Sequence, residues 1–119
     1  MTDRLSSLEL GKMCVHLVAD KKATQICMLD LRGRHTDYLV ICSGTSARHV
    51  TNLGQHLVQQ LTQRGERPLG LEGETGCSWM LVDYGDVVVH LFDEQTRSHY
   101  DIEGLWADAP RIVLPDCCP

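Results

Sequence analysis

The sequence predicts a single α/β domain in which helices pack on a mixed β-sheet. The chain has 119 residues, a length that suits one domain. Hydrophobic residues make up 43% and charged residues 23%, which is the balance of an ordinary globular protein. Apolar residues recur with helical spacing in some segments and form strand-like runs in others. We expect one domain over residues 1–110 and a C-terminal tail over residues 111–119.

The first predicted element is a helix over residues 5 to about 21. Ser6 and Glu9 match a capping box, in which each side chain bonds to a free backbone N–H group of the first turn. Gly11 weakens this helix by about 1 kcal/mol relative to alanine. One face of the helix carries the apolar residues Leu10, Met13, Cys14, Leu17 and Val18.

Two strands and a long helix follow. Residues 23–31 and 36–43 are predicted strands, and the second has an apolar run without alternation, typical of a central strand covered on both faces. A helix is expected from about residue 46 to 64, and Gly65 is placed to end it. Its buried stripe should consist of Val50, Leu53, Leu57 and Leu61.

The stretch "CSWMLVDYGDVVVHLF" (residues 77–92) predicts a β-hairpin, preceded by a short strand at residues 69–71. We place a two-residue turn at Tyr84-Gly85, with Asp83 opposite Asp86. One face is then a core face, pairing Val82 with Val87, Met80 with Val89 and Ser78 with Leu91. The other face pairs Leu81 with Val88 and Trp79 with His90. A last helix is expected after residue 93, ending at Pro110.

The second face of the hairpin is apolar enough to need cover, yet it carries Trp79 beside polar groups. Either a helix of the same chain or a partner protein covers it. Tryptophan is a favoured binding anchor because it buries a large area and keeps a polar tip. A strand tryptophan is also commonly a core residue, so the pattern alone leaves both interpretations of Trp79 open.

The strand–"SGTS"–helix junction at residues 43–46 resembles an anion site, because a helix N-terminus can hold phosphate. There is no Walker lysine and no G-x-G-x-x-G, so Thr45 or Ser46 is more simply a helix cap. A nucleotidyltransferase would pair such a junction with two carboxylates on a neighbouring strand. The chain has no D-x-D; Asp83 and Asp86 flank a turn instead. We therefore predict no enzymatic activity.

Neither histidines nor cysteines predict a metal site or another cofactor. His49 and His56 are seven residues apart, two helical turns, whereas metal-binding pairs on a helix prefer one turn. No C-x-x-C occurs, and free buried cysteine behaves as a small hydrophobe. We expect Cys14, Cys27, Cys42 and Cys77 to be structural, and nothing local supports a designed site at Cys117 and Cys118.

The net charge of the chain indicates which kinds of partner it can bind. A net charge of −5 disfavours broad binding to nucleic acid, which needs clustered lysine and arginine, and favours a basic protein surface. No run approaches the roughly 20 apolar residues of a membrane span, and the first ten residues have no apolar signal-peptide core. We expect a cytoplasmic protein without membrane contact.

Three blocks give the chain a family resemblance: "TDYLVICSGTSARHV", "LEGETGCSWMLVDYGDVVVHLF" and "RSHYDIEGLWADA". Together, over residues 23–109, they resemble the ribosomal silencing factor family, also called the Iojap family. The resemblance implies a fold similar to nucleotidyltransferases without their catalytic carboxylates. It also implies binding to the large ribosomal subunit through its fourteenth protein, which blocks joining of the small subunit and represses translation. Organellar relatives act in large-subunit assembly, and free members are often homodimers.

The resemblance also implies which residues contact the partner. It assigns this role to Trp79 and Asp83 of the second block and to Tyr100 of the third. Tyr84 lies in the turn, at a position that varies in type across the family, and Arg97 matches a common family position; both are also expected at the partner contact. His90 also matches one, and is as readily structural as functional. The tail "PRIVLPDCCP" lies outside the pattern. The leading hypothesis is a translation repressor on the large subunit; the alternatives are an assembly factor and a nucleotidyltransferase-related enzyme.

Overall fold

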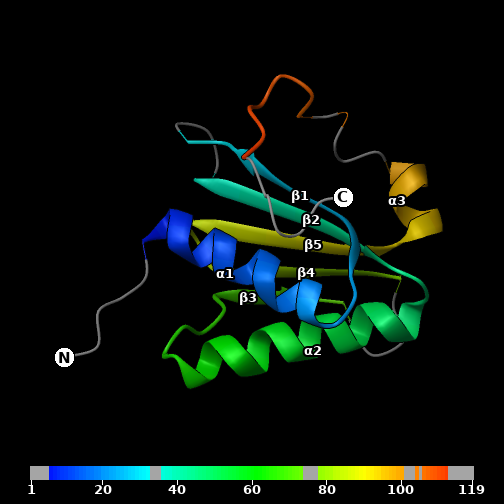
Figure 1. Ribbon diagram of the computed structural model, residues 1–119, viewed down its shortest axis with the longest axis horizontal. Helices are drawn as coiled ribbons and strands as arrows, with labels where there is room; N and C mark the ends of the chain where they lie inside the picture. Colours follow the sequence, from blue (N-terminus) through cyan, green and yellow to red (C-terminus); the bar gives the residue numbers. More distant parts are fainter. Residues whose placement is uncertain (1–5, 33–35, 74–77, 101–103, 105, 113–119) are drawn as a thin grey trace.

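The computed structural model describes residues 6–32, 36–73, 78–100, 104 and 106–112, without the side chain of Tyr100 (Figure 1). Cys77, Cys117 and Cys118 lie outside the described residues, so their predicted roles are not addressed by the structure. The elements are α1 (Ser7–Asp20), β1 (Thr24–Asp30), β2 (Tyr38–Gly44), α2 (Ala47–Gln63), β3 (Gly70–Glu72), β4 (Trp79–Asp83), β5 (Val87–Asp93) and α3 (Glu94–Tyr100).

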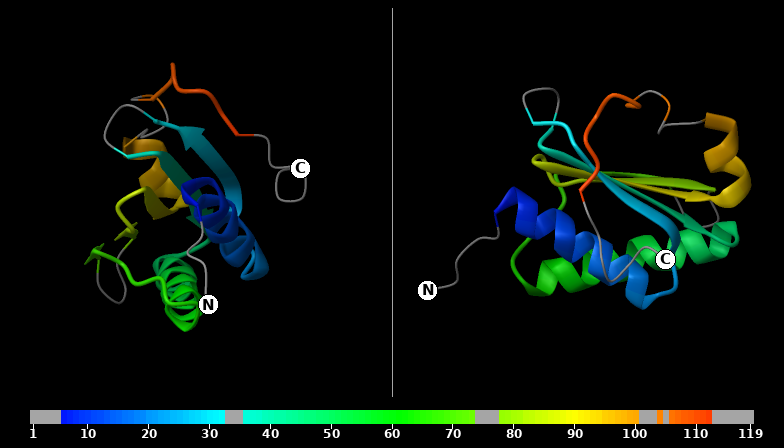
Figure 2. Two further views of the ribbon diagram at one scale, coloured as in Figure 1. Left: turned by 90° about the vertical axis from the view of Figure 1, so that its left-hand side faces the viewer. Right: turned by 45° about the horizontal axis from the view of Figure 1, so that its top comes forward.

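The strands form one mixed sheet in the order β1-β2-β5-β4-β3. β2 and β5 are parallel, and the other neighbours are antiparallel. Helices α1 and α2 lie together on one side of the sheet, and α3 lies at the end of β5 (Figures 1 and 2). The predicted α/β domain with a mixed sheet and packed helices is confirmed.

Helix α1 begins at the predicted capping box. The N–H of Glu9 donates to Oγ of Ser6 at 3.1 Å, and the N–H of Ser6 donates to Oε1 of Glu9 at 2.9 Å. Gly11 lies where α1 approaches β1 closely, because a Cβ there would lie 2.4 Å from Cε of Met28. A larger residue at this position would require the end of the Met28 side chain to move.

Helix α2 confirms the predicted stripe and the predicted end. Val50, Leu53, Leu57 and Leu61 are all fully buried. At the C-terminus Gly65 has φ +86°, and its N–H donates to the carbonyl of Thr62 while that of Glu66 donates to Leu61. This pair of bonds is a Schellman motif, which satisfies the last carbonyls of the helix.

The hairpin forms, but its predicted register is wrong by two residues. Met80 pairs with Leu91 and Trp79 with Phe92, and the two turn residues are Gly85 and Asp86. The glycine has φ +86°, as required at the first central position of a type II′ turn. Because the shift is even, each side chain keeps its predicted face.

The sheet has a different core on each side. The helix-covered core lies under α1 and α2 and includes the predicted hairpin residues Met80, Val82, Val87, Val89 and Leu91. The opposite core is smaller and consists of Cys27, Leu29, Leu31, Leu39, Ile41, Phe92 and Ala109. Strand β2 is buried along its whole length between them, as its apolar run predicted.

The predicted last helix does not extend to Pro110, because Gly104 is still helical whereas the described residues from 106 onwards are not. Residues 106–108 form turns, and the chain then pairs with the outer edge of β1. The N–H of Asp30 donates to the carbonyl of Pro110, and that of Ile112 to Met28, both at 2.8 Å. Residues 110–112 thus lie along the outer edge of β1 (Figure 2), and the expected division of the chain after residue 110 stays a prediction.

Candidate functional site

The side of the sheet opposite α1 and α2 is covered unevenly. Next to β1, where residues 110–112 pair with its edge, Trp106 and Ala109 pack on the opposite core, and Trp79 and Val88 also pack against that core. Towards β4, the side chains of Trp79, Leu81, Asp83, Val88 and His90 are only half-buried. We call these five residues the open half-face. Since they alternate along their strands with fully buried residues, they are the outward-facing set of the hairpin.

An aromatic stack anchors Trp79 within the open half-face. Its ring lies 5.2 Å from that of Phe92 and 5.8 Å from that of His90, measured between centroids. The rings of His90 and Phe92 are 5.9 Å apart and nearly parallel. Because Phe92 is fully buried, it fixes the stack to the core. Trp79 therefore offers a large apolar surface in a defined orientation.

A hydrogen bond determines the protonation state of His90. The Nε1–H of Trp79 donates to Nδ1 of His90 at 3.1 Å. This nitrogen must be unprotonated to accept, so the ring is neutral and carries its proton on Nε2. Burial lowers the pKa of His90 to about 4, which favours the same neutral form. His90 thus holds the tryptophan in place instead of acting as an acid or base near neutral pH.

Asp83 lies at the far end of the open half-face and shapes the turn. Its Oδ1 accepts the N–H of Gly85 at 2.7 Å, a local bond typical of aspartate before a turn. The carbonyl of Gly85 in turn accepts from Oγ1 of Thr36 at 2.8 Å. One carboxylate oxygen is thereby hydrogen-bonded within the turn. The side chain is only half-buried, so its carboxylate can still be reached from the surface.

A hollow of about 240 Å³ adjoins the tryptophan. It is lined by Glu72, Gly73, Trp79 and Leu81. Glu72 pairs with Leu81 across β3 and β4, so its side chain lies on the same side of the sheet. The hollow is an apolar depression with a carboxylate at its rim. The sequence pattern did not reveal it, because Leu81 reads as an ordinary strand residue and the β3 pairing is non-local.

Two of the residues expected to contact a partner do not lie on this face. Tyr84 belongs to the helix-covered core and is 8% exposed, and burial raises the pKa of its hydroxyl. Arg97 is 7% exposed and donates to the carbonyl of Gln25 and to Oγ of Ser43. The side chain of Tyr100 lies outside the described part of the structure. The structure therefore brings together Trp79 and Asp83 and separates them from Tyr84 and Arg97.

At the "SGTS" junction the capping interpretation is confirmed. Oγ of Ser46 accepts the N–H of His49 at 3.1 Å, as an N-cap residue does. The ring of His49 accepts the N–H of Thr45 on Nδ1 at 2.9 Å, and its Nε2 lies 2.8 Å from the carbonyl of Lys21. The amides of Thr45 and His49 at this junction are thus bonded within the chain. The sequence offered no signal for this histidine bridge.

The carboxylates considered for metal-dependent chemistry do not converge. Asp83 and Asp86 lie at the turn, whereas Asp93 lies at the other end of β5, about 20 Å away at 3.3 Å per residue. Asp93 caps α3 by accepting the N–H of Thr96 at 2.7 Å. Among the residues that the structure describes, no three histidine, cysteine or acidic side chains gather as a metal site.

The described cysteines are buried and free, as predicted for Cys14, Cys27 and Cys42. Burial raises the pKa of the thiols of Cys14 and Cys42 to about 12, so neither is a thiolate at neutral pH. In the described part of the chain, no helix is long and apolar enough to cross a membrane.

Comparison with protein families gives one match over nearly the whole chain. The family model described as "Ribosomal silencing factor during starvation" matches residues 4–118. The match therefore includes most of the tail that we expected to lie outside the family pattern.

Individual relatives and solved structures agree with this match. "Ribosomal silencing factor RsfS" of Halalkalibacterium halodurans is 38% identical over 112 residues, 92% of this chain and 96% of the relative. The mouse "Mitochondrial assembly of ribosomal large subunit protein 1" is 37% identical over 79% of this chain and 43% of its own length. Crystal structures of proteins from Chromobacterium violaceum and Bacillus halodurans superpose with a TM-score of 0.80 each. They are 34% and 36% identical, and cover 87% and 90% of this chain and 88% and 99% of their own.

Proposed function

The chain belongs to the ribosomal silencing factor family, and on that premise we propose that it is a non-enzymatic regulator of translation that docks on the large ribosomal subunit. The contact is made by the open half-face with Trp79 at its centre. The partner is the fourteenth protein of the large subunit, and the docked domain blocks joining of the small subunit by its bulk.

The observation that carries this proposal is the rigidly held, half-buried Trp79. A docking anchor is most effective when its side chain is already ordered, because little conformational entropy is then lost on binding. The stack on Phe92 and the bond to His90 provide that order. Aromatic anchors in a partly apolar patch are the residues that most often dominate the energy of an interface.

The charge of the open half-face supports a basic protein partner. Asp83 lies on it, and Glu72 stands at the rim of the adjoining hollow. The whole chain has a net charge of −5. Acidic residues at the rim steer a basic partner and fix its register more than they add affinity. Direct contact with the negatively charged ribosomal RNA would be opposed by the same charges.

A second function, in assembly of the large subunit, is favoured by one observation. The mouse relative is named for assembly of the mitochondrial large subunit. An assembly factor could use the same face on a subunit precursor. Cells lacking the protein distinguish the two: an assembly role predicts accumulated large-subunit precursors, whereas a silencing role predicts complete subunits with altered joining.

The test of the docking face is co-sedimentation with purified large subunits. Wild-type protein should pellet with the subunits, and Trp79→Ala should weaken binding by about 2 kcal/mol or more, as expected for a central aromatic anchor. Asp83→Asn should keep the turn bond from Gly85 while removing the charge, and should therefore weaken binding mainly at low salt.

Matched controls are available on the same chain. Trp106→Ala removes a tryptophan from the covered half of the sheet, and Asp86→Asn removes an exposed charge from the other side of the same turn. Both should bind like wild type when folded. Full binding by Trp79→Ala would refute the face, and failure of folded wild-type protein to bind would refute the function itself.

A further inference from the structure

We propose that Arg97 is a positioning residue, whose buried guanidinium fastens α3 to a bulge in β1 and to the end of β2 and thereby sets the geometry of the open half-face. This inference rests on the proposed docking function and extends it to a residue outside the contact surface. Arg97 is 7% exposed, so its side chain is enclosed by the protein and acts through its neighbours.

The contacts of Arg97 join three elements that are distant in the sequence. Its Nη1 donates to the carbonyl of Gln25 at 2.5 Å and to Oγ of Ser43 at 2.9 Å. Its Nη2 lies 3.9 Å from Sγ of Cys27. Oγ of Ser43 also donates to Oε1 of Gln25 at 3.1 Å, which closes a small network. One side chain of α3 thus connects to both β1 and β2.

The backbone that Arg97 holds is strained. The register of β1 shifts between Thr24 and Cys27, and Gln25 within this bulge has φ +50°. A left-handed backbone is unfavourable for a residue with a side chain and persists where the surroundings enforce it. The carbonyl of Gln25 at this bulge accepts from the guanidinium. The hydrogen bond therefore stabilises a conformation that the strand would not adopt by itself.

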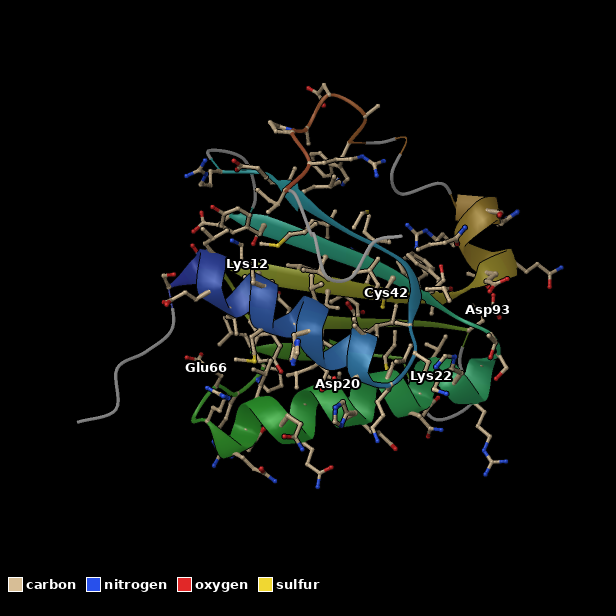
Figure 3. All side chains as sticks on the ribbon, in the orientation of Figure 1. Lys12, Asp20, Lys22, Cys42, Glu66 and Asp93 are labelled. Atoms are coloured by element: carbon tan, nitrogen blue, oxygen red, sulfur yellow. The ribbon has the colours of Figure 1, made fainter. Side chains whose placement is uncertain are left out.

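The position of α3 is linked to the docking face through the end of β5. Trp79 pairs with Phe92, and the N–H of the next residue, Asp93, donates to the carbonyl of Ser78 at 2.9 Å. Asp93 also caps α3 through the N–H of Thr96. Figure 3 shows Asp93 at this junction of β5 and α3. A rotation of α3 would therefore move the strand ends that support the tryptophan.

Helix α3 depends on such a fastening because it is short. Its described run, Glu94–Tyr100, has seven residues, and isolated helices of that length are not stable in water. Its backbone lies against β5 and β2, and its hydrogen bond to β1 is made by Arg97. Glu94, Gln95, Ser98 and His99 are exposed, so Arg97 is the described residue that reaches from the helix into the interior. Loss of its bonds should loosen α3 first and the tryptophan second.

The experiment compares Arg97→Met with Arg97→Lys in binding to purified large subunits and in hydrogen exchange. Arg97→Met keeps an apolar stem and removes the donors, so we expect about tenfold weaker binding, within the usual range for coupling between separate sites. The amides of residues 95–100 should exchange faster, while those of α1 should not change. Arg97→Lys can donate to both Gln25 and Ser43 and should recover most of the affinity.

A control separates positioning from general stability. Val15→Ala destabilises the helix-covered core from α1, where the side chain is 2% exposed, and the described residues of that core include none from α3. Affinities are compared per folded molecule, at a temperature where each variant is native. Equal losses in Val15→Ala and Arg97→Met, or wild-type affinity in Arg97→Met, would overturn the inference. If wild-type protein does not bind, the proposed function fails, and unchanged exchange of α3 in Arg97→Met would then also refute the fastening.

Discussion

Acidification should destabilise this protein through His90 in a predictable pH range. The ring is neutral in the folded protein, with its Nδ1 bonded to Trp79 and its pKa lowered to about 4. In the unfolded chain the pKa of histidine is about 6.5. Between these two values the unfolded chain binds a proton that the folded protein does not. The free energy of unfolding must therefore fall as the pH is lowered through this range.

The magnitude follows from the difference between the two pKa values. Each pH unit contributes about 1.4 kcal/mol, so the whole effect is about 3 kcal/mol and is complete near pH 4. Above pH 6.5 His90 contributes no pH dependence, because it is neutral in both states. A loss of 3 kcal/mol is a large fraction of the stability of an ordinary domain, roughly 5–15 kcal/mol.

The assay is urea denaturation at several pH values between 4.5 and 7.5, for wild-type protein and for His90→Asn. Asparagine can place an acceptor near the position of Nδ1 and does not titrate, so the variant controls for all other groups. Below pH 6.5, the free energy of unfolding of wild-type protein should fall relative to that of His90→Asn by about 1.4 kcal/mol for each pH unit. Parallel pH profiles, or an NMR titration of His90 near pH 6.5 in the folded protein, would refute the reasoning.

Three further predictions concern packing, backbone and thiols. Gly54→Ala should destabilise by about 1–2 kcal/mol in thermal unfolding despite its better helix propensity, because a Cβ would lie 2.3 Å from Sδ of Met80; a gain in stability would contradict this. Gly65→Ala should cost about 1 kcal/mol through its φ of +86°, measured by urea denaturation, whereas exposed Gln63→Ala should cost less. Cys14 and Cys42 should react with a thiol reagent at pH 8 only on unfolding, and rapid labelling of either in folded protein would show that burial does not protect them.

Helices α1 and α2, and which hairpin side chains face the core, were predictable because their signals are local. A capping box, a stripe of apolar residues at helical spacing and a terminal glycine each act within one or two turns. The period of two in β4 and β5 likewise assigned Met80 and Val82 to the core. The register was not determined by these signals, because turns centred one residue apart both contain Gly85. Moving the turn by one residue shifts the paired residues by two positions, so each side chain stays on the same face of the sheet.

The non-local features of the site could not be predicted in this way. Arginine is rarely buried, so a composition-based expectation places Arg97 at the surface. Its interior position depends on a bulge in β1 and a hydroxyl on β2, more than fifty residues away in the sequence. Trp79 was ambiguous for a related reason. Whether it was covered depended on where Trp106 and Ala109 pack, and these residues come just before the segment that pairs with β1 at the other edge of the sheet.

The pairing of residues 110–112 with β1 also limits how the sheet can grow. That pairing occupies the outer hydrogen bonds of one edge strand, while the described sheet ends at the other side with the three residues of β3. An exposed strand edge is a template for another chain. A molecule with two such edges can add copies without end, whereas a molecule with one can only pair. Edge-to-edge association through β3 would leave the fold as it is, whereas association along residues 28–30 of β1 would first require residues 110–112 to leave that strand.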